Sequence, residues 1–249
     1  MPQYPSSVGA LKPPTRLNTL KEIRAPLEWL FALRNRKKLT QAPQGDGRIL
    51  VLVPGYGADQ WSMRPLKKFL STLNYRVFDW GHGRNRGHVE RETELLAETI
   101  KTIQKKHHTE SVTLIGWSLG GVLSREVARL YPKMVSQVIT MGTPLIGGPK
   151  YTVVANKYAK SRKINLDDYE ANIHAINSEG IKQPVTVIYS KSDGVVGWRA
   201  SIDHYNEQAI NIEVNCSHIG MGVSAEVWKI ISETLAVTCV VKKQNSGIE

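Results

Sequence analysis

The segment from residue 112 to residue 129 contains the serine best suited to act as a nucleophile. It reads VTLIGWSLGGVLSREVAR, with Ser118 at the centre of a Gly-x-Ser-x-Gly pattern. An apolar run precedes the pattern, and apolar residues spaced by three and four follow it, so we expect a strand, a tight turn and a helix. A serine in such a turn has strained backbone and an exposed hydroxyl, the geometry of a nucleophile elbow. The alternative interpretation is a β–α turn with a capping serine and no chemistry.

A serine hydroxyl is a weak nucleophile at neutral pH and needs a histidine base that a carboxylate orients. In proteins with this elbow, the acid and then the histidine follow the serine, each in a loop after a later strand. Asp193 stands after an expected strand at residues 185–189, and His218 stands after an expected strand at residues 210–215. We therefore expect Ser118, Asp193 and His218 to form a catalytic triad.

The negative charge that develops on an attacked carbonyl oxygen requires amide donors. We expect these to be the backbone N–H groups of Leu119, directly after the serine, and of Tyr56, in the glycine-rich turn after the apolar run at residues 49–53. Five other residues are candidates for the wall of the substrate pocket: Trp117, His82, Leu145, Ile146 and Val196. This chemistry requires no metal and no cofactor, and we expect none.

The elements that must position these residues alternate between apolar strands and amphipathic helices, which predicts an α/β domain with a mostly parallel central sheet and helices on both faces. Strands are expected at residues 49–53, 75–80, 112–115, 135–141, 185–189 and 210–215, and the main helices at 61–73, 89–107, 119–130 and 223–235. We expect the domain to cover residues 48–240, before a flexible tail at 241–249. The alternation lapses at about residues 143–183, which we interpret as an insertion over the top of the sheet.

Residues 1–47 precede this domain. Residues 1–18 contain four prolines and are expected to form an extended arm. Residues 20–39 have apolar side chains at helical spacing and end in a cluster of arginines and lysines. Two interpretations of this segment stay open: a helix that packs on the main domain with a cationic C-terminus, and a basic amphipathic helix that lies on anionic lipid.

The overall charge is basic, with 33 lysines and arginines against 22 aspartates and glutamates and a formal net charge of +11. Such a charge is compatible with binding to nucleic acid, with binding to an anionic membrane surface, and with a contribution to solubility alone. The basic residues do not alternate with aromatic residues as in known nucleic-acid modules, so we expect no nucleic-acid partner. No signal peptide or membrane span is recognised, which predicts a cytoplasmic protein with peripheral membrane contact as an alternative.

The motifs together resemble those of microbial lipases and esterases of the α/β-hydrolase family. They are Val53-Pro54-Gly55-Tyr56-Gly57, Gly116-Trp117-Ser118-Leu119-Gly120-Gly121, Met141-Gly142-Thr143-Pro144, Ser192-Asp193-Gly194-Val195-Val196 and Ser217-His218. The resemblance implies an α/β-hydrolase fold in which the insertion after the Gly-Thr-Pro sequence is a cap or lid. The chain departs from the family in having Pro54 where many members have histidine, and Leu145 where lipases of the Gly-Thr-Pro type often have histidine. It also contains no His-Gly-Gly-Gly motif.

These observations predict a serine hydrolase that cleaves carboxylic esters, with lipid-like acyl esters favoured, through an acyl-enzyme. A role in lipid metabolism would follow. One alternative is a thioesterase or amidase that uses the same triad. Another is a non-catalytic protein with a hydrolase fold that binds anionic membrane through residues 20–39.

Overall fold

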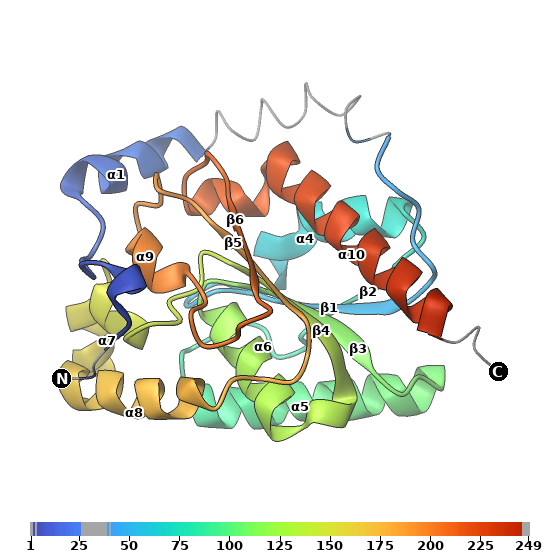
Figure 1. Ribbon diagram of the computed structural model, residues 1–249, viewed down its shortest axis with the longest axis horizontal. Coiled ribbons are helices and arrows are strands. Elements are labelled where there is room, and N and C mark those ends of the chain that lie inside the picture. The colour runs from blue at the N-terminus through green and yellow to red at the C-terminus, as the bar shows by residue number, and fades with distance from the viewer. Residues whose placement is uncertain (1, 3, 26–38, 40, 246–249) are drawn as a thin grey trace.

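A parallel sheet of six strands forms the centre of the computed structural model, which describes residues 2, 4–25, 39 and 41–245 (Figure 1). The strand order is β2-β1-β3-β4-β5-β6, and each neighbouring pair is parallel. The strands are β1 (Ile49–Val53), β2 (Arg76–Asp79), β3 (Val112–Trp117), β4 (Val135–Met141), β5 (Val185–Tyr189) and β6 (Ile210–Glu213). The predicted mostly parallel α/β architecture is therefore confirmed.

The inner strands are apolar because both of their faces are covered by helices. Every residue of β1 and β3 is buried, whereas most of the edge strand β6 is exposed. Alternate residues of β1 point to opposite faces: Leu50 and Leu52 pack in one apolar cluster, and Ile49, Val51 and Val53 pack in another.

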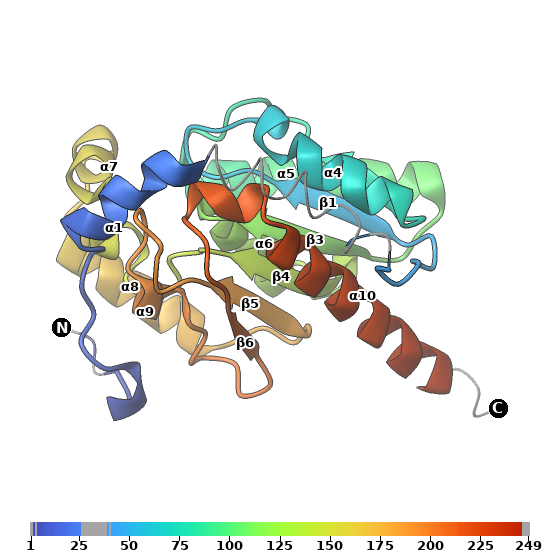
Figure 2. The ribbon, with the colours of Figure 1, turned by 90° about the horizontal axis from the view of Figure 1, so that it is seen from above.

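Helices cover both faces of the sheet (Figures 1 and 2). Helices α4 (Gln60–Thr72) and α10 (Ala225–Asn245) contribute apolar residues to the first cluster. Helices α5 (Val89–His107) and α6 (Leu119–Leu130) contribute to the second cluster, on the opposite face. The remaining short helices of the main domain are η3 (Pro132–Met134), α9 (Trp198–Ser201) and η5 (Ile219–Gly222).

Most predicted boundaries agree with the structure to within two residues, and the main difference is at the C-terminus. Helix α10 continues to Asn245 instead of ending at Leu235, so the first half of the tail expected at residues 241–249 is helical. The apolar periodicity marked the first part of α10, where Val227, Ile231 and Leu235 are buried.

The expected insertion between β4 and β5 contains η4 (Gly148–Tyr151), α7 (Ala155–Arg162) and α8 (Leu166–Ser178). These helices lie at the same end of the molecule as α1 (Arg16–Lys21), on the left of Figure 1. Asn165 caps α8 by accepting from the backbone N–H groups of Asp167 and Asp168. The function of this segment as a cap or lid stays a prediction.

The N-terminal arm differs from the extended segment expected at residues 1–18. It contains η1 (Ser6–Val8) and α1, and η2 (Glu22–Arg24) follows. The Thr15 side chain starts α1 by accepting a hydrogen bond from the Asn18 N–H. The arm is not detached, because Val8 is buried in a cluster with residues of the main domain.

Most of the amphipathic helix expected at residues 20–39, including its cationic end, lies outside the described residues. The interpretation as a membrane-binding helix therefore stays a prediction. Over the described ranges, no helix combines the length and the apolarity that crossing a bilayer requires.

Candidate active site

Ser118 lies in the tight turn between β3 and α6, with backbone angles of φ 54° and ψ −123°. A non-glycine residue in such a conformation stores about 1–3 kcal/mol of strain and persists only when its surroundings hold it. The Ser118 N–H donates to the carbonyl of Met141, at the end of β4, over 2.8 Å. The flanking glycines permit the turn, because a Cβ on Gly120 would lie 2.1 Å from the Val53 carbonyl oxygen and one on Gly116 would lie 2.4 Å from the Gly121 backbone.

Asp193 and His218 are brought together from loops after β5 and β6. Nδ1 of His218 lies 2.7 Å from Oδ2 of Asp193, and both residues are buried. The other oxygen of Asp193 accepts from the backbone N–H groups of Val195 and Val196, at 2.8 and 2.7 Å, which fixes the carboxylate. Because Nδ1–H donates to Asp193, Nε2 is the ring nitrogen that remains to accept a proton.

Opposing effects act on the pKa of His218. Burial lowers this pKa because it penalises the imidazolium ion, while the charge and hydrogen bond of Asp193 and the charge of Glu22 raise it. The net result is a pKa above the ordinary imidazole value.

Ser118 and His218 line one cavity of about 260 Å³. Tyr56 and Leu119, the expected oxyanion residues, line it as well. The turn after β1 passes directly beside the serine, since a Cβ on Gly55 would lie 3.1 Å from the Ser118 Cβ. The Leu119 N–H belongs to the first residue of α6 and so has no acceptor within the helix.

Three of the five predicted pocket residues line this cavity: Trp117, Leu145 and Val196. His82 does not, because its loop turns toward α5, where Nε2 lies 2.8 Å from Thr99 Oγ1 and 2.9 Å from the Leu95 carbonyl oxygen. Ile146 is also absent from the wall and is buried instead in the cluster that includes Val8.

Sequence reasoning did not identify several wall residues. Those contributed by the segment between β4 and β5 are mainly apolar or aromatic: Pro144, Pro149, Val154, Tyr158, Tyr169 and Ile173. Val122 and Arg125 of α6 also line the cavity. A signal for these two exists, since residues 118, 122 and 125 are spaced by four and three and share one side of the helix that begins at the serine.

Arg125 introduces a buried charge at the cavity wall. Its Nη1 lies 2.6 Å from Oδ2 of Asp203, and its Nη2 lies 3.2 Å from Oδ1 of Asn206. The other oxygen of Asp203 accepts from the N–H groups of Tyr205 and Asn206. The two buried charges therefore compensate each other. Asp203 pairs with Arg125, whereas the His218 ring pairs with Asp193.

Among the described residues, no group of three or more histidine, cysteine, aspartate or glutamate side chains is placed to hold a metal ion.

The family model for the alpha/beta hydrolase fold matches residues 48–160, which include Ser118 and end before Asp193. The six-stranded parallel sheet, the elbow at Ser118 and this match give the chain the α/β-hydrolase fold. The matched residues begin just before β1, include the elbow, and end within α7 in the segment after β4.

Curated relatives include pimeloyl-[acyl-carrier protein] methyl ester esterases. The enzyme of Aliivibrio salmonicida is 30% identical over 105 residues, which are 40% of this chain and 38% of the relative. That of Hamiltonella defensa is 31% identical over 108 residues, which are 42% of this chain and 40% of the relative. The match therefore spans about two-fifths of the length of each relative.

Solved α/β hydrolases resemble a larger part of the chain. The monoacylglycerol lipase of Paleococcus ferrophilus has a TM-score of 0.60 at 20% identity, over 79% of this chain and 97% of that one. The thioesterase domain from the curacin biosynthetic pathway has a TM-score of 0.54 at 11% identity, over 78% and 93%. At these identities the likeness shows the fold alone.

Proposed function

We propose that this α/β hydrolase is a serine hydrolase that cleaves carboxylic esters with an apolar acyl chain. The observation that carries the proposal is the 2.7 Å hydrogen bond between Asp193 and His218, beside a cavity that His218 lines together with Ser118. The positive φ of Ser118 supports it further, because such strain is concentrated at functional sites.

In the proposed reaction, the Ser118 hydroxyl oxygen attacks the ester carbonyl carbon while Nε2 of His218 takes the hydroxyl proton. The amides of Tyr56 and Leu119 donate to the carbonyl oxygen as it becomes negative. The imidazolium, oriented by Asp193, then gives its proton to the departing alkoxide and leaves an acyl-enzyme. Water attacks the acyl group with His218 as base, which releases the acid and restores Ser118.

The cavity wall supports an apolar acyl chain as the group that is bound. Aliphatic and aromatic side chains from the segment between β4 and β5 form much of this wall, and such surface favours burial of methylene groups by about 0.8 kcal/mol each. We propose that this segment acts as the cap. The curated relatives are named as methyl ester esterases, which makes a small alcohol a reasonable leaving group to test first.

A thioesterase is the second candidate, because the likeness to a thioesterase domain is compatible with the same site. An oxyester and a thioester that carry the same acyl chain would distinguish the two activities through the ratio of their kcat/KM values.

The test is hydrolysis of p-nitrophenyl esters from short to long acyl chain, with labelling by a serine-reactive phosphonate. Ser118→Ala should abolish labelling and lower kcat by about five to six orders of magnitude. Ser124→Ala is the matched control: this buried serine lies in α6, the helix that follows Ser118, but its hydroxyl donates to the Gly120 carbonyl. It should retain labelling at Ser118.

A folded wild type that neither hydrolyses any ester or thioester nor reacts with the phosphonate would contradict the proposal. Sedimentation of the full chain with anionic vesicles would then test the non-catalytic alternative. Salt-sensitive binding would support a peripheral membrane role.

A further inference from the structure

Glu22, the first residue of η2 and the residue directly after α1, contacts through its carboxylate both loops that carry the proposed acid and base. Oε1 of Glu22 accepts from the backbone N–H groups of Gly194 and His218, each over 2.8 Å. Oε2 accepts from the N–H of Ile219 over 2.9 Å. One side chain therefore joins the residue directly after Asp193 to the histidine itself, across 172 and 196 positions of sequence.

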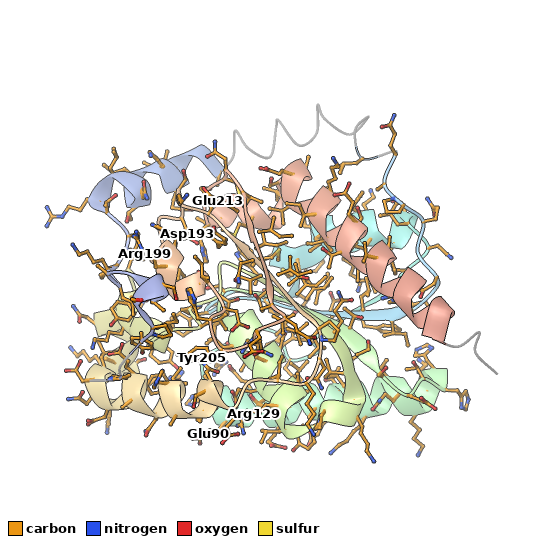
Figure 3. All side chains as sticks on the ribbon, viewed as in Figure 1. Glu90, Arg129, Asp193, Arg199, Tyr205 and Glu213 are labelled. Atoms are coloured by element: carbon orange, nitrogen blue, oxygen red, sulfur yellow. The ribbon has the colours of Figure 1, made fainter. Side chains whose placement is uncertain are left out.

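The arm is packed closely enough on these loops to hold Glu22 in place. The Thr19 hydroxyl donates to the Gly194 carbonyl over 2.9 Å, and the Asn18 side-chain amide donates to the Lys191 carbonyl over 2.9 Å. A Cβ on Gly194 would lie 2.3 Å from the Asn18 carbonyl oxygen, so the two backbones are in contact. Figure 3 labels Asp193 on the side of the molecule where α1 lies.

We propose that Glu22 is a positioning residue of the active site, which holds the Asp193 and His218 loops in register and adds a second negative charge beside the histidine. This inference rests on the proposed function for its effect on rate. The contacts themselves do not depend on which ester is cleaved.

The geometry explains why a carboxylate is needed at this position. A carboxylate is an acceptor at both oxygens, so it can satisfy all three N–H donors at once. Glutamine in the same place has a single oxygen, and its NH₂ group would face one of these donors. Such a change loses at least one hydrogen bond and the negative charge while it preserves the shape of the side chain.

The charge has a separate effect on the histidine. In the described part of the chain, the carboxylates whose charges act on His218 are Asp193, from the loop after β5, and Glu22, from η2. Arg125 and Glu126 of α6 line the same cavity, and the uncharged Trp117 packs beside the His218 ring. Burial lowers the pKa of His218, whereas both carboxylates raise it. Loss of the Glu22 charge should therefore lower this pKa and move the acid limb of the pH–rate profile to lower pH.

The experiment compares Glu22→Gln, Glu22→Asp and Thr19→Val in the full chain. Glu22→Gln should lower kcat/KM by about 10- to 100-fold, the scale expected when a catalytic group is displaced by about 1 Å. It should also move the acid limb to lower pH. Glu22→Asp keeps the charge but is one methylene shorter, so kcat/KM should fall with a smaller movement of the acid limb.

Thr19→Val is the matched control, because it removes a hydrogen bond from the same arm to the same Gly194 without changing charge. It should leave the acid limb where the wild type has it. If Thr19→Val and Glu22→Gln lower activity equally and neither moves the limb, Glu22 serves only to attach the arm and the inference fails. Unchanged kinetics in a folded Glu22→Gln protein would overturn it as well.

A readout that is independent of turnover separates this inference from the proposed function. The imidazole proton resonances of His218, assigned with His218→Gln, can be titrated by NMR in the wild type and in Glu22→Gln. A lower midpoint in the variant supports the role of Glu22 even if no ester is hydrolysed, in which case only the proposed function fails. Equal midpoints exclude an electrostatic role.

Discussion

Gly142 lies directly against the ring of His218: a Cβ at this position would be 2.9 Å from His218 Nδ1 and 3.0 Å from Asp193 Oδ2. The glycine follows β4 and has φ 53°. The Gly-Thr-Pro sequence after this strand therefore has a physical role in the chain, since only a residue without a side chain leaves room for the hydrogen bond between acid and base.

Gly142→Ala should lower kcat/KM by about 10- to 100-fold, because the added methyl group pushes His218 and Asp193 apart. Esterase kinetics measure this loss. Gly47→Ala is the control: Gly47 also has positive φ, but nothing lies within 4 Å of the added Cβ. It should lose about 1 kcal/mol of stability through backbone strain and retain activity. Equal activity of the two variants would contradict the role assigned to Gly142.

Asp193→Asn should reduce kcat by about four orders of magnitude, because the amide no longer holds the histidine in the tautomer that can act as base. Thermal unfolding should change little in comparison. Asp203→Asn provides the contrast, since Asp203 has a similar turn geometry but pairs with buried Arg125. It should cost several kcal/mol of unfolding free energy and spare the chemical step. A reversal of these two phenotypes would exchange the roles of the two aspartates.

Activity should rise with pH through the pKa of His218, because only the neutral imidazole can accept the serine proton. Asp193 and Glu22 outweigh burial and raise this pKa, so the acid limb should lie above about 6.5, the ordinary imidazole value. An acid limb below that value would contradict the net direction.

The same raised pKa makes a prediction for stability. A group whose pKa is higher in the folded state contributes stability that is complete below the unfolded pKa and disappears as pH rises through the folded pKa. His218→Gln should therefore lose more unfolding free energy relative to the wild type at about pH 5.5 than at about pH 8. Urea denaturation at the two pH values measures this difference.

Ile173→Phe should shift the substrate preference to shorter acyl chains, because Ile173 of α8 lines the cavity and a larger side chain there reduces its volume. Its kcat/KM for short esters should stay close to that of the wild type. Ile210→Phe is the control, because it makes the same substitution at an exposed position of the edge strand β6. An unchanged chain-length profile in Ile173→Phe would show that the acyl chain does not occupy this part of the cavity.

Local sequence pattern was sufficient to predict much of the fold. The apolar runs predicted the strands β1, β3, β4 and β5, and the alternation of apolar strands with amphipathic helices predicted α5 at residues 89–107, which are its observed bounds. Asp193 and His218 were found because the carboxyl ends of parallel strands lie at one edge of a sheet. Their hydrogen bond is present in the structure, while the catalytic role of Ser118 with them stays a proposal.

Contacts between distant segments could not be predicted in this way. His82 follows a strand as a pocket residue would, yet its ring contacts α5. Residues 1–18 have the composition of a loose arm, yet Val8 is buried. In each case the local sequence leaves the direction of a loop open, and that direction depends on which surface the loop packs against.

The sequence by itself determined the order of strands and helices, the elbow at Ser118 and the loops that contain Asp193 and His218, because these depend on residue types close together in the chain. Only the tertiary structure decided that Glu22 bonds both of those loops, that Arg125 pairs with Asp203, and which side chains line the cavity. Such contacts arise when the folded sheet brings together segments that are remote in sequence, and no short-range pattern encodes them.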